Sequence, residues 1–157
     1  MPIILARIDD RLIHGQVTVG WGMRLKPEVI VVVSDHVASS PWERDLYLAT
    51  LPENITGIIA YVNEASTIIN ELSVDGRASY VLFESPRDAY QVVQNGACLS
   101  SINVGGMHSA KGKREVLHYL FLDEMDSFYI KALHEKGIRL DFRDLPDHDN
   151  VDVLSRL

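Results

Sequence analysis

The sequence has little of what several classes of protein require. Cysteine occurs only at Cys98, so no disulfide can form within the chain and a reducing compartment is expected. The 15 Lys and Arg residues are outnumbered by 22 Asp and Glu, which argues against a nucleic-acid partner, because phosphate backbones attract broadly basic surfaces. No apolar run approaches the roughly 20 residues of a membrane-spanning helix. The start, MPIILARIDD, lacks the basic region of a signal peptide.

Other motifs that the sequence lacks argue against particular kinds of binding site. No G-x-G-x-x-G motif is present, which argues against a dinucleotide-dependent oxidoreductase. In NVGGMHSAKGK, five residues separate Gly106 from Gly112 where a phosphate-binding loop requires four, and Arg114 replaces the required Ser or Thr. We expect neither metal nor cofactor, because paired metal-ligand spacing is lacking at His108, His118, His134 and His148. Between Ala97 and Leu99, Cys98 is expected to be a small buried residue.

What the sequence does contain is a regular alternation of strand-like and helix-like segments. At 157 residues and 46% hydrophobic composition, we expect one domain spanning residues 1–157. Strands are predicted at 3–8, 28–34, 55–62, 78–85, 99–105, 115–122 and 138–146. Helices are predicted from residue 15 or 16 and at 40–49, 63–72, 85–96, 123–136 and 150–157. The predicted fold class is therefore α/β, with an open, mostly parallel twisted sheet of about seven strands and helices on both faces.

Two details of this prediction can be tested directly. Only GGMHSAKGKR lies between SSINV and EVLHYLFL, which is too short for a crossover helix, so strand 115–122 is expected to run antiparallel to its neighbour. The helix that begins after Ser40 should present Trp42, Leu46 and Ala49 on one apolar face. Trp21 is expected in the core.

The loop after the first strand, IDDRLIHG, has the composition of an anion-binding site. Ligands of open α/β sheets gather beyond the carboxyl ends of the strands, near the point where strand order reverses. Arg7 and Arg11 supply guanidinium donors, and a helix that begins near Gly15 or Gln16 presents backbone N–H groups. His14 is the nucleophile of this loop, since a neutral imidazole with an ordinary pKa of about 6.5 carries a lone pair.

The segment ARIDDRLIHGQV, residues 6–17, closely resembles the signature of the IIB component of the mannose–fructose–sorbose family of the bacterial sugar phosphotransferase system. The resemblance continues, in order along nearly the whole chain, through VVVSD, LFESP, INVGGMH and GIRLDFRDLP. It implies a phosphotransferase component that accepts a phosphoryl group from a phosphohistidine of the IIA component. It also implies transfer onward to a sugar that enters through the membrane components IIC and IID.

The resemblance also assigns site residues. The motif histidine falls on His14, with Nδ1 as the acceptor atom, and Arg7, Asp10 and Arg11 match the motif. It implies a cytoplasmic protein held at the inner face of the membrane through IIC and IID, with a homodimer as a further possibility. The identity of the sugar stays open.

Several roles stay open. Arg11 is the predicted phosphoryl ligand, whereas Arg7 either shares that role or braces the loop. Asp10 either orients the imidazole or, the interpretation we favour, pairs with an arginine, and Asp9 is expected to be a loop or cap residue. Asp35 is a candidate for the edge of the site. Loop 105–114 either borders the site or meets a partner, or else forms a solvated turn.

Two other classes of function compete with a phosphocarrier. IHGQ faintly resembles the Arg-His-Gly motif of phosphohistidine phosphatases and mutases, but Ile13 stands where that motif has arginine. The third class is a regulatory module that has kept the fold, against which the intact His14 argues.

Overall fold

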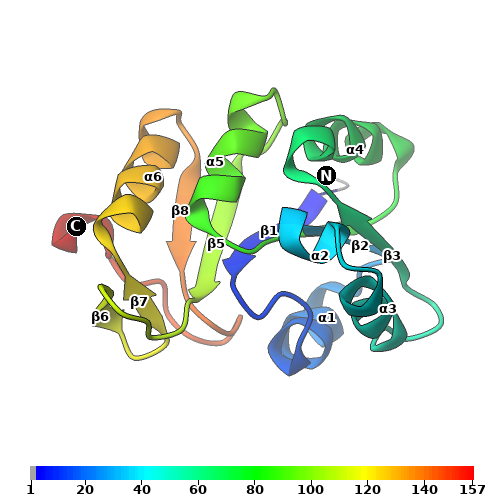
Figure 1. The fold of residues 1–157 in the computed structure, drawn as a ribbon, viewed down its shortest axis with the longest axis horizontal. Coiled ribbons are helices and arrows are strands. Elements are labelled where there is room, and N and C mark those ends of the chain that lie inside the picture. Colours follow the sequence, from blue (N-terminus) through cyan, green and yellow to red (C-terminus); the bar gives the residue numbers. More distant parts are fainter. Residues whose placement is uncertain (1–2) are drawn as a thin grey trace.

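The computed structural model describes residues 3–157, without the side chains of Gln16, Thr18, Val19 and Met23. Its main sheet contains β1 (Ile3–Asp9), β2 (Val29–Val33), β3 (Thr56–Ala60), β4 (Ser79–Phe83), β5 (Ser101–Gly106) and β8 (Arg139–Phe142). The strands lie in the order β3-β2-β4-β1-β5-β8, and every neighbouring pair is parallel. The first strand of the chain is therefore central, and its carboxyl end lies beside that of β5 (Figure 1).

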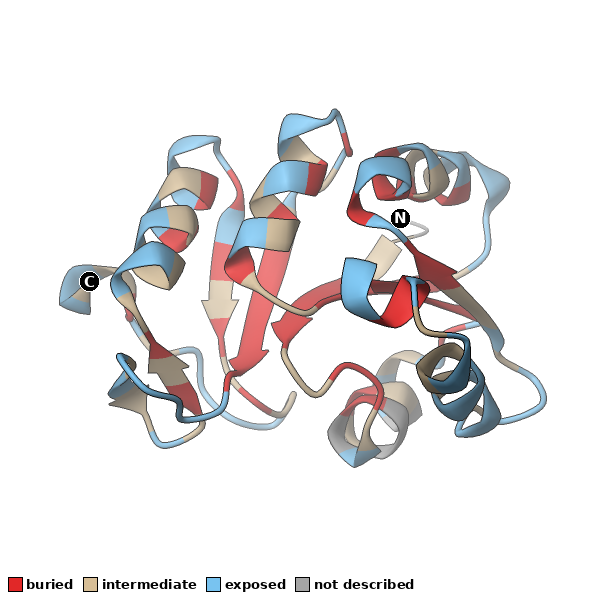
Figure 2. Cartoon of the chain, viewed as in Figure 1, coloured by how far each residue is buried: buried red, intermediate tan, exposed pale blue. Residues whose placement is uncertain are grey.

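Helices cover both faces of this sheet. The chain forms the π-helix η1 (Gln16–Trp21), α1 (Gly22–Leu25), α2 (Asp35–Ala38), α3 (Pro41–Ala49), α4 (Val62–Asp75), α5 (Pro86–Gln94), α6 (Glu124–Glu135) and the 3-10 helix η2 (Leu154–Arg156). Residues of α4, α5 and α6 share one hydrophobic core, whereas residues of η1 and α2 share the other. The sheet between them is the most deeply buried layer (Figure 2). The predicted α/β fold class is confirmed.

The run VIVVV of β2 shows how one strand serves both cores. Val29, Val31 and Val33 belong to the core under α4, and Ile30 and Val32 belong to the opposite core. Side chains alternate between the two faces of a strand, so a strand buried on both faces must be continuously apolar. All five residues are fully buried.

The antiparallel segment differs from the expected single strand. Residues 115–122 fall mostly into a hairpin of β6 (Arg114–Leu117) and β7 (Leu120–Leu122), which forms its own two-stranded antiparallel sheet. The connection is too short for a crossover, as predicted, but the chain turns back at His118 and Tyr119 instead of joining the main sheet. Leu120 forms a parallel bridge with Met107, which fixes the hairpin beside the end of β5.

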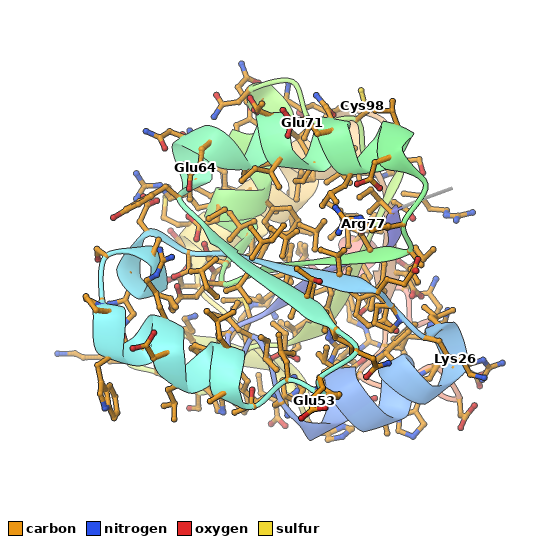
Figure 3. The ribbon with its side chains drawn as sticks, turned by 90° about the vertical axis from the view of Figure 1, so that its right-hand side faces the viewer. Lys26, Glu53, Glu64, Glu71, Arg77 and Cys98 are labelled. Carbon is orange, nitrogen blue, oxygen red and sulfur yellow. The ribbon has the colours of Figure 1, made fainter. Side chains whose placement is uncertain are left out.

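Two expectations about burial are wrong. Cys98 is exposed, because it lies in the loop before β5, where its backbone N–H donates to Asn70. Figure 3 shows it at the surface on the side of the sheet covered by α4. The predicted apolar face of α3 also points outward, with Trp42 73% and Leu46 50% exposed, since this helix packs through Tyr47. Trp21, in contrast, is buried as predicted.

Within residues 3–157, no helix is both long enough and apolar enough to cross a membrane.

Candidate functional site

The site is built around Asp9, the last residue of β1. Residues two apart on a strand share a face, so Asp9 points to the same side of the sheet as Arg7. The two side chains are fully buried, and Nη2 of Arg7 lies 2.9 Å from Oδ2 of Asp9. A buried carboxylate needs a positive partner and hydrogen bonds to remain charged. Arg7 supplies the first of these.

The chain after Asp9 folds into a tight turn that returns His14 to this carboxylate. The backbone N–H of Arg11 donates to Oδ1 of Asp9 at 3.1 Å, and the N–H of Leu12 donates to the Asp9 carbonyl at 3.0 Å. Leu12 takes a left-handed conformation with φ of 59°, which is rare for a residue other than glycine and is found where surrounding structure holds the chain. Nε2 of His14 then lies 3.1 Å from Oδ2 of Asp9.

Arg11 completes a cluster of one carboxylate, two guanidinium groups and one imidazole. Its Nε donates to Oδ1 of Asp9 at 3.0 Å and its Nη2 to Oδ2 at 2.8 Å. Burial alone would raise the pKa of Asp9, but hydrogen bonds from His14 and Arg11 and the charge of Arg7 outweigh it and hold that pKa well below its ordinary value. Asp9 is therefore ionised and can only accept hydrogen bonds.

The two arginines differ in access to solvent. The side chain of Arg7 is completely buried, whereas that of Arg11 is 32% exposed. Desolvation lowers the pKa of Arg7 against the opposing charge of Asp9, while the hydrogen bond to Asp9 raises the pKa of Arg11. Of the two guanidinium groups, only that of Arg11 reaches the surface, where an incoming anion can meet it.

Neighbouring strand β5 holds Arg7 in place. Nη1 of Arg7 donates to Oδ1 of Asn103 at 2.7 Å, and its guanidinium lies against Gly105 so closely that an added Cβ would overlap it. Gly106 leaves similar room for Arg11, whose Nη2 would lie 3.3 Å from a Cβ at that position. The pair of glycines in INVGGMH is thus explained by two guanidinium groups that rest on the end of β5.

We expect Gly105→Ala to be destabilising by about 1–3 kcal/mol, because the methyl group overpacks a rigid site. Urea unfolding of the wild-type chain and the variant measures this loss. Gly15→Ala is the matched control, because a Cβ there meets nothing within 4 Å. Equal free energies of unfolding for the two variants would show that Arg7 does not need the space above Gly105.

Trp21 covers the buried side of the cluster. Its indole ring contacts two guanidinium groups, with Cζ of Arg7 5.7 Å and Cζ of Arg143 5.4 Å from the ring centroid. Its Nε1 donates to the carbonyl of Asp144 at 3.0 Å. Cation–π contacts of this kind stabilise desolvated arginines. The segment after β8 therefore helps to fix Arg7.

Asp10 has neither of the two predicted roles, which were to orient the imidazole of His14 or to pair with an arginine. Its Oδ1 is 2.7 Å from Nδ1 of His108, and its Oδ2 accepts the His108 backbone N–H at 2.8 Å. Asp9, not Asp10, contacts the imidazole of His14 and pairs with the arginines. The physical reason is strand alternation, which turns Asp9 into the cluster and Asp10 away from it, toward the loop that follows β5.

The other predicted residues lie around this centre. Gly15 is exposed and follows His14 directly at the start of the helical segment, and the side chain of Gln16 lies outside the described residues. Asp35 follows β2 at the same edge of the sheet, but its Oδ1 accepts the N–H of Val62 at 2.8 Å, at the start of α4. It supports a helix rather than contacting His14.

Two of the predicted roles of loop 105–114, as a border of the site and as a solvated turn, each apply to a part of the loop. His108 binds Asp10, so the beginning of the loop borders the site. Nζ of Lys113 lies 3.3 Å from Oδ2 of Asp126 on α6, and Arg114 donates to the carbonyl of Arg156. Lys111 is exposed. Two of the basic residues of the loop, Lys113 and Arg114, thus contact other elements of the fold.

Comparison with known proteins adds a consistent family assignment. Residues 3–157 match the family model described as PTS system sorbose subfamily IIB component. The chain is 31% identical to the fructose-specific EIIB component of Bacillus subtilis, over all of this chain and 96% of that protein. It is 35% identical to the mannose-specific EIIAB component of Escherichia coli K12, and spans half of that longer protein. The crystal structure of the IIBSor domain of the sorbose permease from Klebsiella pneumoniae superposes with a TM-score of 0.91 at 29% identity, covering 99% of this chain and 96% of that domain.

Proposed function

This chain belongs to the sorbose subfamily of IIB components of the phosphotransferase system, and on that premise we propose that it is a phosphocarrier acting through His14. In this proposal residues 1–157 act as one IIB domain that takes a phosphoryl group from a phosphohistidine and delivers it to a sugar. The observation that carries it is the 3.1 Å contact between Nε2 of His14 and the ionised Asp9.

That contact supports Nδ1 as the ring nitrogen that reacts. Because ionised Asp9 only accepts, Nε2 of His14 carries the proton and donates it, so the lone pair of the neutral ring is on Nδ1. Nδ1 attacks the phosphorus of the donor phosphohistidine. The new P–N bond forms as the old one breaks, and the bonding electrons return to the donor imidazole. No proton needs to move during this step.

Asp9 and Arg11 stabilise the phosphorylated state in different ways. A ring with the phosphoryl group on Nδ1 and a proton on Nε2 carries positive charge, which Asp9 stabilises as an aspartate does beside a reacting histidine elsewhere. Arg11, partly exposed, binds the phosphoryl oxygens, and the backbone at Gly15 and Gln16 lies next to them. Arg7, completely buried, braces Asp9 and does not touch the phosphoryl group. Such positioning and charge stabilisation is what phosphoryl transfer mainly requires.

The proposed partners follow from the family. The donor is a phosphorylated IIA component, and the E. coli relative is named as a combined A and B component, EIIAB. The acceptor is a sugar presented by the membrane components IIC and IID, so we place this chain at the cytoplasmic face of the membrane. The activity is that of a protein-phosphohistidine–sugar phosphotransferase component.

Arg11→Ala tests the assigned roles. We expect the rate of phosphoryl transfer from phosphorylated IIA to fall at least tenfold, because the phosphoryl oxygens lose a charged donor, while the Kd for IIA changes less than threefold. Radiolabelled transfer measures the rate and calorimetry measures docking. Equal losses in both would assign Arg11 to the protein interface instead.

The same assay separates the competing classes of function. A phosphocarrier forms an acid-labile adduct on the chain, in an amount of one phosphoryl group per molecule. Steady release of inorganic phosphate from small phosphomonoesters, without IIA, would identify a phosphatase or mutase, and failure to take up label would indicate a regulatory module.

A further inference from the structure

A cavity of about 340 Å³ opens beside the loop that follows β1, the loop that carries His14. Asp10 and Arg11 form one wall, the loop after β5 forms another through His108, and the β6–β7 hairpin supplies a third through Tyr119 and Phe121. Its volume is in the range of small-molecule sites. Arg11 belongs both to this cavity and to the Asp9–His14 cluster, so the cavity adjoins that cluster.

The walls are fixed to one another by hydrogen bonds. The N–H of Met107 donates to the carbonyl of Tyr119 at 3.0 Å, and the N–H of Phe121 donates to the carbonyl of Met107 at 3.1 Å. The two contacts from Asp10 to His108 tie the same loop to the end of β1. The cavity is therefore pre-organised, which lowers the entropic cost of binding a ligand.

The lining combines hydroxyl-binding groups with aromatic rings. Asp10 accepts a hydrogen bond from Nδ1–H of His108, so the lone pair of the neutral imidazole is on Nε2. The side chain of His108 is 68% exposed. The rings of His118 and Tyr119 meet edge to face, with centroids 5.0 Å apart, and Phe121 lies in the same wall. A few placed polar groups among aromatic side chains are typical of sites for small polar ligands. The hydroxyls of a sugar ring could bind the polar side chains of this cavity, and the C–H face of the ring could pack against its aromatic rings.

We propose that this cavity is a subsite for the acceptor sugar, in which His108 and Asp10 bind its hydroxyls and Phe121 packs against its ring. The proposal rests on the proposed function, because the sugar is the one small molecule that must reach phosphorylated His14. In the transfer, a sugar oxygen forms a P–O bond as the P–Nδ1 bond breaks. The electron pair returns to the ring of His14, and the hydroxyl proton passes to Nε2 of His108.

The test measures loading and discharge separately on the full chain. Loading is the transfer of label from phosphorylated IIA, and discharge is its transfer to mannose, fructose, sorbose or N-acetylgalactosamine, each added with membrane vesicles that carry IIC and IID. For His108→Ala we expect at least a tenfold slower discharge, with loading within twofold of wild type. For Phe121→Ala we expect at least a fivefold higher KM for the sugar. His134→Ala, which removes an exposed imidazole at the end of α6, is the control.

The outcomes of this test distinguish a sugar in the cavity from a docked protein. Unchanged discharge and KM in both variants would overturn the subsite, and a loss of loading equal to the loss of discharge would assign the cavity to a docking protein instead. A wild-type chain that cannot be loaded would contradict the proposed function itself. Titration of the chain with the same sugars, followed by NMR, gives a second readout. Chemical-shift changes confined to residues 106–109 and 118–121 support the subsite, and their absence opposes it.

Discussion

We expect His14→Ala to abolish phosphoryl acceptance and to leave the fold intact. The nucleophilic Nδ1 is removed, and alanine offers no atom to which a phosphoryl group can transfer. The fold should survive because Asp9 keeps its contacts with Arg7 and Arg11, and we expect the free energy of unfolding to fall by about 1.5–3 kcal/mol, the contribution of one hydrogen bond to a charged group. Radiolabel uptake from phosphorylated IIA, together with circular dichroism, measures both effects.

His134→Ala provides the matched control for this prediction. It removes an imidazole from an exposed position on α6, so uptake of label should equal that of the wild type. If His14→Ala still takes up one phosphoryl group per molecule, another side chain is the carrier.

Asp9→Asn has the second largest expected effect, and it acts on both stability and rate. The variant leaves Arg7 completely buried without its counter-charge, and removing one partner of such a pair costs about 3–5 kcal/mol. It also allows the side-chain amide to donate, so the proton of His14 is no longer held on Nε2. Loss of the carboxylate that orients a reacting histidine lowers rates by up to about 10⁴-fold, and we expect at least a hundredfold here.

Urea unfolding and the initial rate of label uptake measure the two effects separately. Asp147→Asn is the control, because Asp147 also pairs with an arginine, Arg24, but at 85% exposure. Exposed pairs contribute at most about 1 kcal/mol. An Asp9→Asn chain that is unstable but loads at the wild-type rate would reduce Asp9 to a structural residue and contradict the mechanism.

The fold was predictable where hydrophobic patterning is strong. The continuous apolar run of β2 indicated a strand buried on both faces. The helices predicted at 40–49, 85–96 and 123–136 form where expected, with Ser40, Ser85 and Asp123 as their N-caps. The hairpin was missed because EVLHYLFL contains none of the Gly, Pro, Asn or Asp residues that usually mark a turn. A β-turn at His118 and Tyr119 depends on the docking of the hairpin against Met107, a tertiary contact that local sequence does not encode.

Local sequence also predicted only part of the candidate site, because the rest depends on tertiary contacts. Their types and their position at and after the end of the first strand singled out His14, Arg7 and Arg11, and the structure brings these three side chains together around Asp9. Asp9 was misjudged because the predicted strand ended at Ile8, although extending it by one residue and applying a period of two places Asp9 beside Arg7. Asn103, Gly105 and His108 lie in the INVGGMH segment that carries part of the resemblance, but their roles could not be predicted, because these depend on the pairing of β5 with β1.

The central claim is that Asp9 holds the proton of His14 on Nε2 and so directs the phosphoryl group to Nδ1. Nitrogen-15 and phosphorus-31 NMR of the wild-type chain, before and after loading from phosphorylated IIA, tests it most directly. The account predicts the Nε2–H tautomer of His14 in the free protein and a single phosphoryl group coupled to its Nδ1 after loading. A phosphoryl group on Nε2 of His14, or on any other side chain, would contradict it.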